Sequence, residues 1–481
     1  MKAAVFFIFV LVLSACEGKF PGERIYSLTD LSGPYKMREV EIDGASYLGV
    51  LNTDYRGQYG DGSLHFYSLA APAELSLNES LSLRIPSNAA DFFYDSETSE
   101  LFVLSRNTSQ ILIFERSGSG FSPKVTNGKD LRIDVVTGPQ SFAFFEIPEE
   151  EKRLLAISSF SNGQLQFFDL DNRRLASLAE IESLNEAEFD PAVDLDVRIG
   201  GTPEAPLALL DARPRKENIT SFPIENDLGL RIASRSSGLG DLIYLGGEKH
   251  SFAVASTLSS SLFNFDFLGF TSTSNFFWDL NKFDRGYKQG ETSIPGSRDR
   301  GFLSIAKDGD GSIFMTSRAD NSIYKMDSAL MNASPEIFES PADSGSFVEL
   351  NTTVFKRDVQ AYRLPIDFDS DINDKVFPRL FHMTVNNQAA GSATRAYVLG
   401  LQNPREEDSR SRLYLVDLSG NSILATYDFE DGDYPQYVYL LEEEALLYVS
   451  VSGANKIRSF DVSADTFAIT QELGIIDSSE K

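Results

Sequence analysis

The stretch from Leu446 to Asp461, with the sequence LLYVSVSGANKIRSFD, decides the fold. It begins with the short apolar run Leu446 to Val451, continues through the turn residues Ser452 to Asn455, and ends in a second run that closes on Phe460 and Asp461. A short apolar run bounded by turn residues predicts a strand, and Gly and Asn between two such runs predict the tight turn of a hairpin. The end of the chain therefore predicts an antiparallel pair of strands.

Hairpins of this kind recur along the chain. Their first strands begin at Leu48, Leu101, Leu154, Leu207, Phe252, Ile313, Ala396 and Leu446. A further strand precedes most of them, such as Ala90 to Tyr94, and a fourth follows, such as Leu131 to Val135. Units of four strands with a period of about 56 residues are typical of the blades of a β-propeller. We expect an all-β propeller of eight four-stranded antiparallel blades. Seven blades is the alternative, because the Leu207 hairpin matches the pattern least well.

Two of the hairpins resemble the YVTN-type β-propeller repeat. The matching residues are Tyr448-Val449-Ser450 followed by Asn455-Lys456-Ile457, and Phe314-Met315-Thr316 followed by Asn321-Ser322-Ile323. Such propellers usually have seven blades, which the resemblance sets against the count of eight. The turn residues tolerate left-handed backbone, and the Asp that closes many units can cap the next turn through its carboxylate. We therefore interpret these repeated residues as structural.

The first residues predict export and lipidation. Lys2 precedes the apolar run Val5 to Leu13, which has the length of a signal-peptide core and is short for a transmembrane helix. The segment Leu13-Ser14-Ala15-Cys16 resembles the lipobox of bacterial lipoproteins, in which the Cys is lipidated and becomes the new N-terminus. The resemblance implies that Cys16 carries a lipid anchor in the bacterial cell envelope. Glu17 in the next position favours the outer membrane. An ordinary secretory signal is the alternative.

These signals divide the chain into four segments. We expect a signal peptide over residues 1–15, a lipidated tether over 16–34, the propeller over 35–475 and a short tail over 476–481. Two insertions interrupt the repeat, one from Thr271 to Arg300 and a longer one from Ser328 to Lys375. Long loops in a regular scaffold often carry function, although they also drift freely.

The composition narrows the classes of partner. The formal net charge of −28 argues against nucleic acid and anionic lipid surfaces. The single cysteine, Cys16, excludes an intramolecular disulfide, and lipidation would account for it. The 37 Phe and 18 Tyr residues suit packed sheets rather than disorder.

The hairpin turns carry positive charge on this acidic chain. In a propeller, the turns between the second and third strands of all blades lie on one face. Here they contain the candidate binding residues Arg56, Arg106, Arg213, Arg318, Asn321, Arg405 and Lys456. We expect a locally basic face that binds a carboxylate, a phosphate or an acidic partner segment. The alternative is that these cations pair with neighbouring Glu and Asp residues.

Catalytic and metal motifs are sparse. His65, His250 and His382 lie far apart without the spacing of a zinc site, and no GxSxG motif is present. Asp367, Asp369 and Asp371 alternate on a short acidic segment, as oxygen ligands of Ca²⁺ do. They lack the Gly and Glu of an EF-hand loop, so a solvated acidic loop is the main interpretation. No catalytic residue and no cofactor other than this Ca²⁺ is predicted.

The favoured function is a membrane-anchored binding or scaffold propeller for an envelope protein or a small anionic ligand. A metal-dependent hydrolase of the lactonase type is an alternative, since YVTN-like repeats overlap with such propellers in appearance. It would need metal-binding or acid/base residues in the central channel, where Asp91, Asp194 and Asp196 are candidate positions. A surface-exposed recognition or adhesion lipoprotein is a further alternative.

Overall fold

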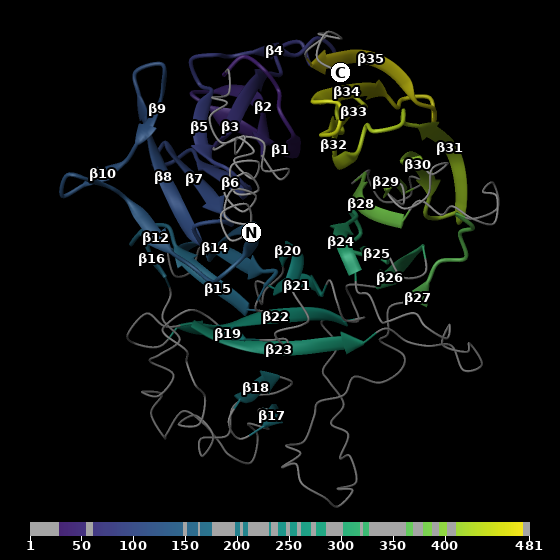
Figure 1. Ribbon diagram of the computed structural model, residues 1–481. Helices are drawn as coiled ribbons and strands as arrows, with labels where there is room; N and C mark the ends of the chain where they lie inside the picture. Colours follow the sequence, from purple (N-terminus) through teal and green to yellow (C-terminus); the bar gives the residue numbers. More distant parts are fainter. Residues whose placement is uncertain are drawn as a thin grey trace, which may run out of the picture.

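The structure is a computed structural model that describes residues 28–53, 61–147, 152–161, 164–175, 198–202, 205–209, 230–231, 239–246, 251–256, 261–270, 276–284, 302–317, 321–326, 362–368, 379–386, 394–401 and 410–474. Antiparallel sheets follow one another along this part of the chain and surround a common centre (Figure 1). The chain is therefore an all-β propeller, as its repeats predicted. Among the described residues, no helix has the length and apolar character needed to cross a membrane.

The first three sheets each have five strands. The first contains β1 (Pro34–Ile42), β2 (Ala45–Asn52), β3 (Asp61–Ser68), β4 (Ser76–Leu77) and β5 (Leu83–Pro86). The second contains β6 (Ala89–Asp95), β7 (Glu100–Ser105), β8 (Gln110–Ser117), β9 (Gly120–Pro123) and β12 (Arg132–Asp134), with the hairpin β10 (Val125–Thr126) and β11 (Lys129–Asp130) beside it in sequence. The third contains β13 (Pro139–Ile147), β14 (Lys152–Ser159), β15 (Gln164–Asp169), β16 (Arg174–Leu175) and β19 (Leu230–Arg231).

Four sheets of four strands complete the ring. They contain β20 (Leu239–Gly246), β21 (Ser251–Ser256), β22 (Ser261–Phe270) and β23 (Phe276–Asp284); then β24 (Phe302–Lys307), β25 (Ile313–Ser317), β26 (Ser322–Met326) and β27 (Tyr362–Arg363). The last two contain β28 (Arg379–Val385), β29 (Arg395–Leu401), β30 (Arg412–Asp417) and β31 (Ser422–Asp428); then β32 (Pro435–Leu441), β33 (Leu446–Val451), β34 (Lys456–Asp461) and β35 (Ala468–Gly474).

The expectation of eight blades is wrong for the described residues. The hairpin predicted at Leu207 has β18 (Ala205–Leu209) paired only with β17 (Arg198–Thr202), in a separate two-stranded sheet. Pro206 supplies no N–H to a strand ladder, and the sequence nearby is rich in Pro and charge. This segment therefore lacks the four-stranded pairing of the other units within the part of the chain that the structure describes.

One predicted insertion contributes to a sheet. The segment Thr271 to Arg300 was expected to interrupt the repeat, but its residues 276–284 form β23, which pairs with β22 along its length. Trp278 lies opposite Phe267 in this pairing. Aromatic residues favour strands because they pack well on a pleated surface, which accounts for the strand.

The innermost strand of each sheet contacts the innermost strand of the next. In order around the ring these strands are β1, β6, β13, β20, β24, β28 and β32, and β32 contacts β1 again. Hydrophobic side chains fill the space between neighbouring sheets. For example, Leu64 and Phe66 of the first sheet pack with Phe92 and Leu112 of the second. Burying one such side chain contributes about 1.5–3 kcal/mol.

The first and last sheets meet at a seam that no strand crosses. Leu48 and Tyr67 of the first sheet pack against Tyr448 and Ile457 of the last. Ser450 Oγ donates a hydrogen bond of 2.9 Å to the Tyr35 carbonyl across the same seam. Side-chain packing and scattered hydrogen bonds therefore close the ring, rather than a strand exchanged between the two ends of the chain.

The interpretation of the closing Asp residues as turn caps is confirmed. Asp417 accepts hydrogen bonds from the backbone N–H groups of Ser419 and Gly420, at 2.9 and 2.8 Å. Asp461 accepts one from the N–H of Ser463 at 2.9 Å. These carboxylates hold the turns between the third and fourth strands, so they act on the fold and not on a ligand.

Candidate functional site

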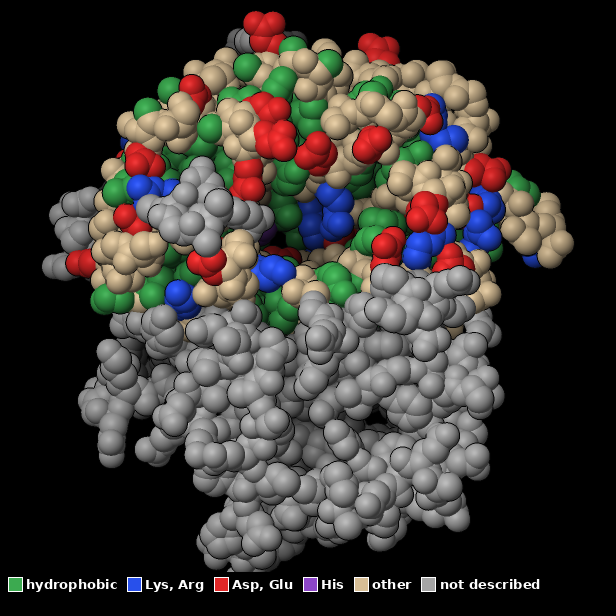
Figure 2. All heavy atoms as spheres, turned by 180° about the vertical axis from the view of Figure 1, so that it is seen from behind, with side chains coloured by type: hydrophobic (Ala, Val, Ile, Leu, Met, Phe, Trp, Pro, Cys, Tyr) green, Lys and Arg blue, Asp and Glu red, His purple; other side chains and the backbone are tan. Residues whose placement is uncertain are grey.

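A cavity of about 200 Å³ lies at the centre of the ring. Five of the innermost strands, β1, β20, β24, β28 and β32, together with the first residues of β13 and two hairpin turns, supply its wall. The lining residues named below are Tyr35, Lys36, Arg106, Gln140, Phe160, Asp241, Leu303, Phe381, His382 and Tyr437. Figure 2 shows Lys or Arg side chains in the hollow at the middle of one face, with acidic side chains around it. The ring therefore surrounds a space with polar and apolar walls.

A bulge at the start of every innermost strand shapes this centre. The register between first and second strands shifts at Pro34/Lys36, Ala89/Asp91, Pro139/Ser141, Leu239/Leu242, Phe302/Ile305, Leu380/His382 and Pro435/Tyr437. A bulge inserts a residue and re-aims the side chain beside it. At or within these bulges stand the polar residues Lys36, Asp91, Ser141, Asp241, Ser304, His382 and Tyr437. One polar side chain per sheet is thus placed at an equivalent position near the axis.

Asp91 is one of these seven polar residues and is fully buried. Its carboxylate receives hydrogen bonds from Lys36 Nζ at 2.6 Å, from the Phe142 N–H at 2.7 Å and from Ser141 Oγ at 3.2 Å, and Arg38 Nη2 lies at 3.2 Å. Burial alone would raise the pKa of Asp91, but the charges of Lys36 and Arg38 and these bonds hold that pKa below its usual value. Asp91 is therefore an ionised carboxylate whose bonding capacity is taken up by the protein.

Lys36 keeps its charge although it is buried. Burial, the largest single influence, would lower the pKa of Lys36, but the charges of Asp91, Tyr437 and Asp241 together raise that pKa above its usual value. The ammonium donates to Asp91 and, at 3.1 Å, to Ser141 Oγ. A lysine ammonium has three N–H donors. The third has no partner among the described residues, and Lys36 lines the cavity, so it can serve a ligand.

Asp241, His382 and Tyr437 form another part of the wall, within reach of the charge of Lys36. His382 Nδ1 accepts a hydrogen bond of 3.3 Å from the Val438 N–H, and its ring packs at a tilt against Tyr437 with centroids 3.9 Å apart. Burial, assisted by the charge of Lys36, lowers the pKa of His382 to about 3. His382 is therefore neutral, and because Nδ1 is an acceptor, Nε2 carries the proton.

Among the described residues, no Lys or Arg nitrogen lies within 4 Å of the Asp241 carboxylate. The basic nitrogen that the described residues bring nearest is His382 Nε2, at 4.0 Å, which is too long for a hydrogen bond. Burial raises the pKa of Asp241 and the charge of Asp91 adds to this, while Lys36 and a hydrogen bond with Ser304 oppose it. Among the described residues no Lys or Arg pairs with it. Its side chain is 21% exposed, so an incoming group can reach it.

Arg106 brings a second cation to the cavity from the turn between β7 and β8. Its Nη2 bonds to Gln140 Oε1, and its Nε donates to the Pro139 carbonyl at 3.5 Å. Gln140 Nε2 in turn lies 3.4 Å from the hydroxyl of Tyr35. A guanidinium has five N–H donors, and these contacts leave several for a ligand.

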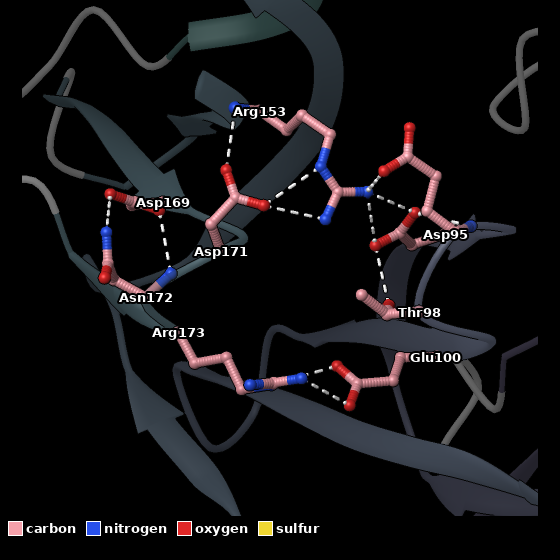
Figure 3. Close-up of polar contacts among 9 residues, drawn as sticks. Asp95, Thr98, Glu100, Arg153, Asp169, Asp171, Asn172 and Arg173 are labelled. Carbon is pink, nitrogen blue, oxygen red and sulfur yellow. Dashed lines mark hydrogen bonds and ion pairs between the residues drawn. The ribbon is translucent and has the colours of Figure 1, made fainter. Parts of the chain in front are cut away.

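A second charge cluster occupies the other end of the same strands (Figure 3). Arg153 Nη1 lies 2.8 Å from Asp95, and its Nη2 lies 2.7 Å from Asp171. Arg173 pairs with Glu100 at 2.9 Å, and Lys124 pairs with the same carboxylate. We call these residues the paired end. Every one of their charged groups meets an opposite charge on a neighbouring strand or turn, so the cluster ties the second sheet to the third.

Three of the residues predicted for a basic face lie among the described residues. Arg106 lies at the cavity as described. Lys456 Nζ is 2.5 Å from Glu472, an internal ion pair of the kind that the alternative expected. The Asn321 side chain accepts a hydrogen bond of 3.2 Å from the Leu380 N–H. The candidates Arg56, Arg213, Arg318 and Arg405 lie outside the described residues, as does Cys16.

The predicted Ca²⁺ site is described only at Asp367, which is exposed; Asp369 and Asp371 lie outside the described residues. Within the part of the chain that the structure describes, no group of three or more His, Cys, Asp or Glu residues could hold a metal ion.

Sequence reasoning missed Lys36, Asp241, His382 and Tyr437 as members of one site, although it named Asp91 as a channel position. The signal was a single polar residue followed by an apolar one at the start of each innermost strand, as in Lys36-Met37 and His382-Met383. This signal is visible only when the repeats are aligned strand by strand.

Comparison with known proteins gives no family. No family model matches the chain, and no curated protein matches it. Among solved structures, virginiamycin B lyase from Staphylococcus aureus is 10% identical, with 89% of this chain and 96% of that chain covered and a TM-score of 0.42. Hydrazine synthase from Kuenenia stuttgartiensis is 10% identical, with 92% and 99% covered and a TM-score of 0.47. AztD from Citrobacter koseri is 12% identical, with 86% and 92% covered and a TM-score of 0.39. Likeness at this level carries no function to this chain, so function is argued from the cavity.

Proposed function

We propose that this chain is a ligand-binding propeller that takes a small molecule with an anionic group into its central cavity. The observation that carries the proposal is the pair of cations on the cavity wall, Lys36 and Arg106, each with N–H donors that no other described residue takes up. Lys36 is buried and Arg106 is half-buried, and they stand together at the axis of a chain whose net charge is −28. Charge-assisted hydrogen bonds of this kind are among the strongest contacts available to a carboxylate or phosphate.

Calorimetric titration with a panel of small carboxylates and inorganic phosphate tests this binding. We expect at least one anion to bind, and Arg106→Gln to weaken it about tenfold or more, because each bond to a charged group contributes about 1.5–3 kcal/mol. Arg132→Gln is the matched control, since Arg132 sits half-exposed on β12 and pairs with Asp130. Failure of every anion to bind, or equal binding to the Arg106→Gln protein, contradicts the proposal.

We further propose that Cys16 is lipidated and anchors the propeller in the bacterial cell envelope, where it binds its ligand or an envelope partner. The support is the apolar run before Leu13-Ser14-Ala15-Cys16, which resembles a lipobox. Two or more acyl chains give stable membrane attachment, whereas one chain gives only a reversible one. Mass spectrometry of the mature N-terminus should find an acylated Cys16, and Cys16→Ser should release the protein from the membrane fraction. Protease treatment of intact cells then distinguishes a surface-exposed propeller from a periplasmic one.

A further inference from the structure

The cavity wall is chemically divided. On one part stand Lys36 and Arg106, which have unused donors. On another stands Asp241, whose carboxylate has Ser304 and no described cation as a partner. Both parts line the same space of about 200 Å³. A ligand that carried only an anionic group would leave Asp241 uncompensated, and a buried carboxylate without a partner is costly.

The protein does not resolve this imbalance with its own cations. Lys36 is directed to Asp91 by a 2.6 Å contact, and Arg38 is bound to the same carboxylate at 3.2 Å. His382 is the nearest basic side chain to Asp241 among the described residues, but it is neutral and packs against Tyr437, so it brings no charge. Burial and the charge of Asp91 raise the pKa of Asp241, although Lys36 and Ser304 oppose this, which agrees with a carboxylate that has no directly bonded cation.

We propose that the ligand is a zwitterion of the class of a free amino acid, with its carboxylate on Lys36 and Arg106 and its ammonium on Asp241. This inference rests on the proposed function and specifies the ligand of the same cavity. The ammonium supplies the charge that Asp241 lacks, and the carboxylate fills the free N–H donors of Lys36 and Arg106. Electrostatic complementarity of this kind favours the zwitterion over either of its charged halves.

The size and apolar surface of the cavity fit such a ligand. A volume of about 200 Å³ has room for a small molecule of the size of a free amino acid. Phe160 lies at the cavity wall and is 45% exposed, and Leu303 and Phe381 also line the space. These side chains offer an apolar surface to the ligand side chain.

The test compares each ligand with its two halves. Purified full chain is titrated by calorimetry with free L-amino acids and, for each, with the carboxylate that lacks the amino group and the amine that lacks the carboxylate; alanine, propionate and ethylamine form one such set. We expect at least one amino acid to bind about tenfold or more tightly than its matched carboxylate. A carboxylate that binds as tightly as its amino acid overturns the zwitterion while leaving the anion-binding function intact. If no carboxylate and no amino acid binds, both proposals fail.

Asp241→Asn provides the residue-level test, since it keeps the shape of the side chain and removes the charge. We expect it to reduce the preference for the amino acid over the carboxylate to less than about threefold, while the carboxylate binds as well or better. Asp130→Asn, on the exposed hairpin β10–β11, is the matched control and should change neither value. An unchanged preference in Asp241→Asn overturns the assignment of the ammonium to this residue. Thermal melting of both variants shows whether the fold is retained.

The pH dependence of binding has opposite signs for the two ligand types. The groups that face Asp241 are His382, Lys36, Asp91, Tyr437 and Ser304. His382 stays neutral and Lys36 stays charged near neutral pH, so Asp241 is the group that changes. As the pH falls and Asp241 takes up a proton, amino acid affinity should decrease and carboxylate affinity should hold or increase. Affinities that decrease together contradict the proposal.

Discussion

Asp91 and Asp95 lie four residues apart on β6 and point to the same side of the strand, yet their surroundings differ. Asp95 belongs to the paired end, where Arg153 meets it at 2.8 Å and the turn supplies the N–H of Glu97 and the hydroxyl of Thr98. Asp91 belongs to the cavity end, where Lys36 keeps an N–H donor that no other described residue takes up, and where a further carboxylate, Asp241, has no Lys or Arg within 4 Å among the described residues. The comparison teaches that buried charge does not by itself mark a binding site. A binding site is marked instead by hydrogen-bond donors and charges that the protein leaves without a partner.

The largest effect is expected from Asp91→Asn. The substitution leaves the buried Lys36 ammonium without its carboxylate, and breaking a buried ion pair on one side costs about 3–5 kcal/mol. Urea denaturation should show this decrease in the free energy of unfolding. A decrease in the free energy of unfolding below about 1 kcal/mol would mean that water reaches and solvates the Lys36 ammonium.

Acid should weaken the cavity end at a higher pH than the paired end. The folded-state pKa of His382 is lowered to about 3, so the unfolded chain takes up a proton near pH 6.5 that the folded chain cannot. Stability is therefore lost as the pH falls below about 6.5, on the order of 2 kcal/mol by pH 4.5 for this residue. His65, buried on β3 with its pKa lowered to about 4, adds a loss of the same sign.

The paired end should respond only at lower pH. Burial alone would raise the pKa of Glu100, but bonds from Arg173 and Lys124 outweigh it and lower that pKa. This stability is present above about pH 4.5 and is lost as the pH falls through the folded-state pKa. Unfolding titrations of His382→Asn, which keeps an acceptor for Val438, and of Glu100→Gln should change different limbs of the pH profile. Changes over the same limb would contradict the distinction between the two ends.

A moderate effect on stability alone is expected from Arg153→Met. The substitution leaves Asp95 and Asp171 without their shared guanidinium, at a cost of about 1–2 kcal/mol. Because the cluster lies at the far end of β6 and β14 from the cavity, ligand affinity should stay within about twofold. Calorimetry on the folded variant measures this, and a large loss of affinity would show that the two ends are coupled.

The smallest effect is expected from Lys456→Gln. Lys456 pairs with Glu472 at the surface, and exposed ion pairs contribute about 0–1 kcal/mol. Neither ligand affinity nor the free energy of unfolding should change by more than about 0.5 kcal/mol. A loss of binding would restore the hypothesis that this turn belongs to a basic binding face.

The sequence was informative about the strands and less so about the site. The apolar run Leu446 to Val451 and the Asn at the following turn are local signals, so the hairpin from β33 to β34 could be predicted. Asn455 has the positive φ of 55° that such a turn requires. Lys36 and Asp241 are 205 positions apart in sequence, and only closure of the ring brings their strands to one cavity. The bulges also escaped prediction, because their mark, one polar residue before an apolar one, is visible only when the repeats are aligned strand by strand.

The seam between the first and last sheets has a consequence for how the chain folds. Each sheet is built almost wholly from neighbouring strands, so most pairing is between residues close in sequence and can form early. The sheets can therefore form one after another along the chain. The seam forms last, since the hydrogen bond from the Leu75 N–H to Gln471 joins residues of the first and last sheets. Until the two ends meet, the ring is an open arc, so the closed cavity that would hold a ligand depends on this seam.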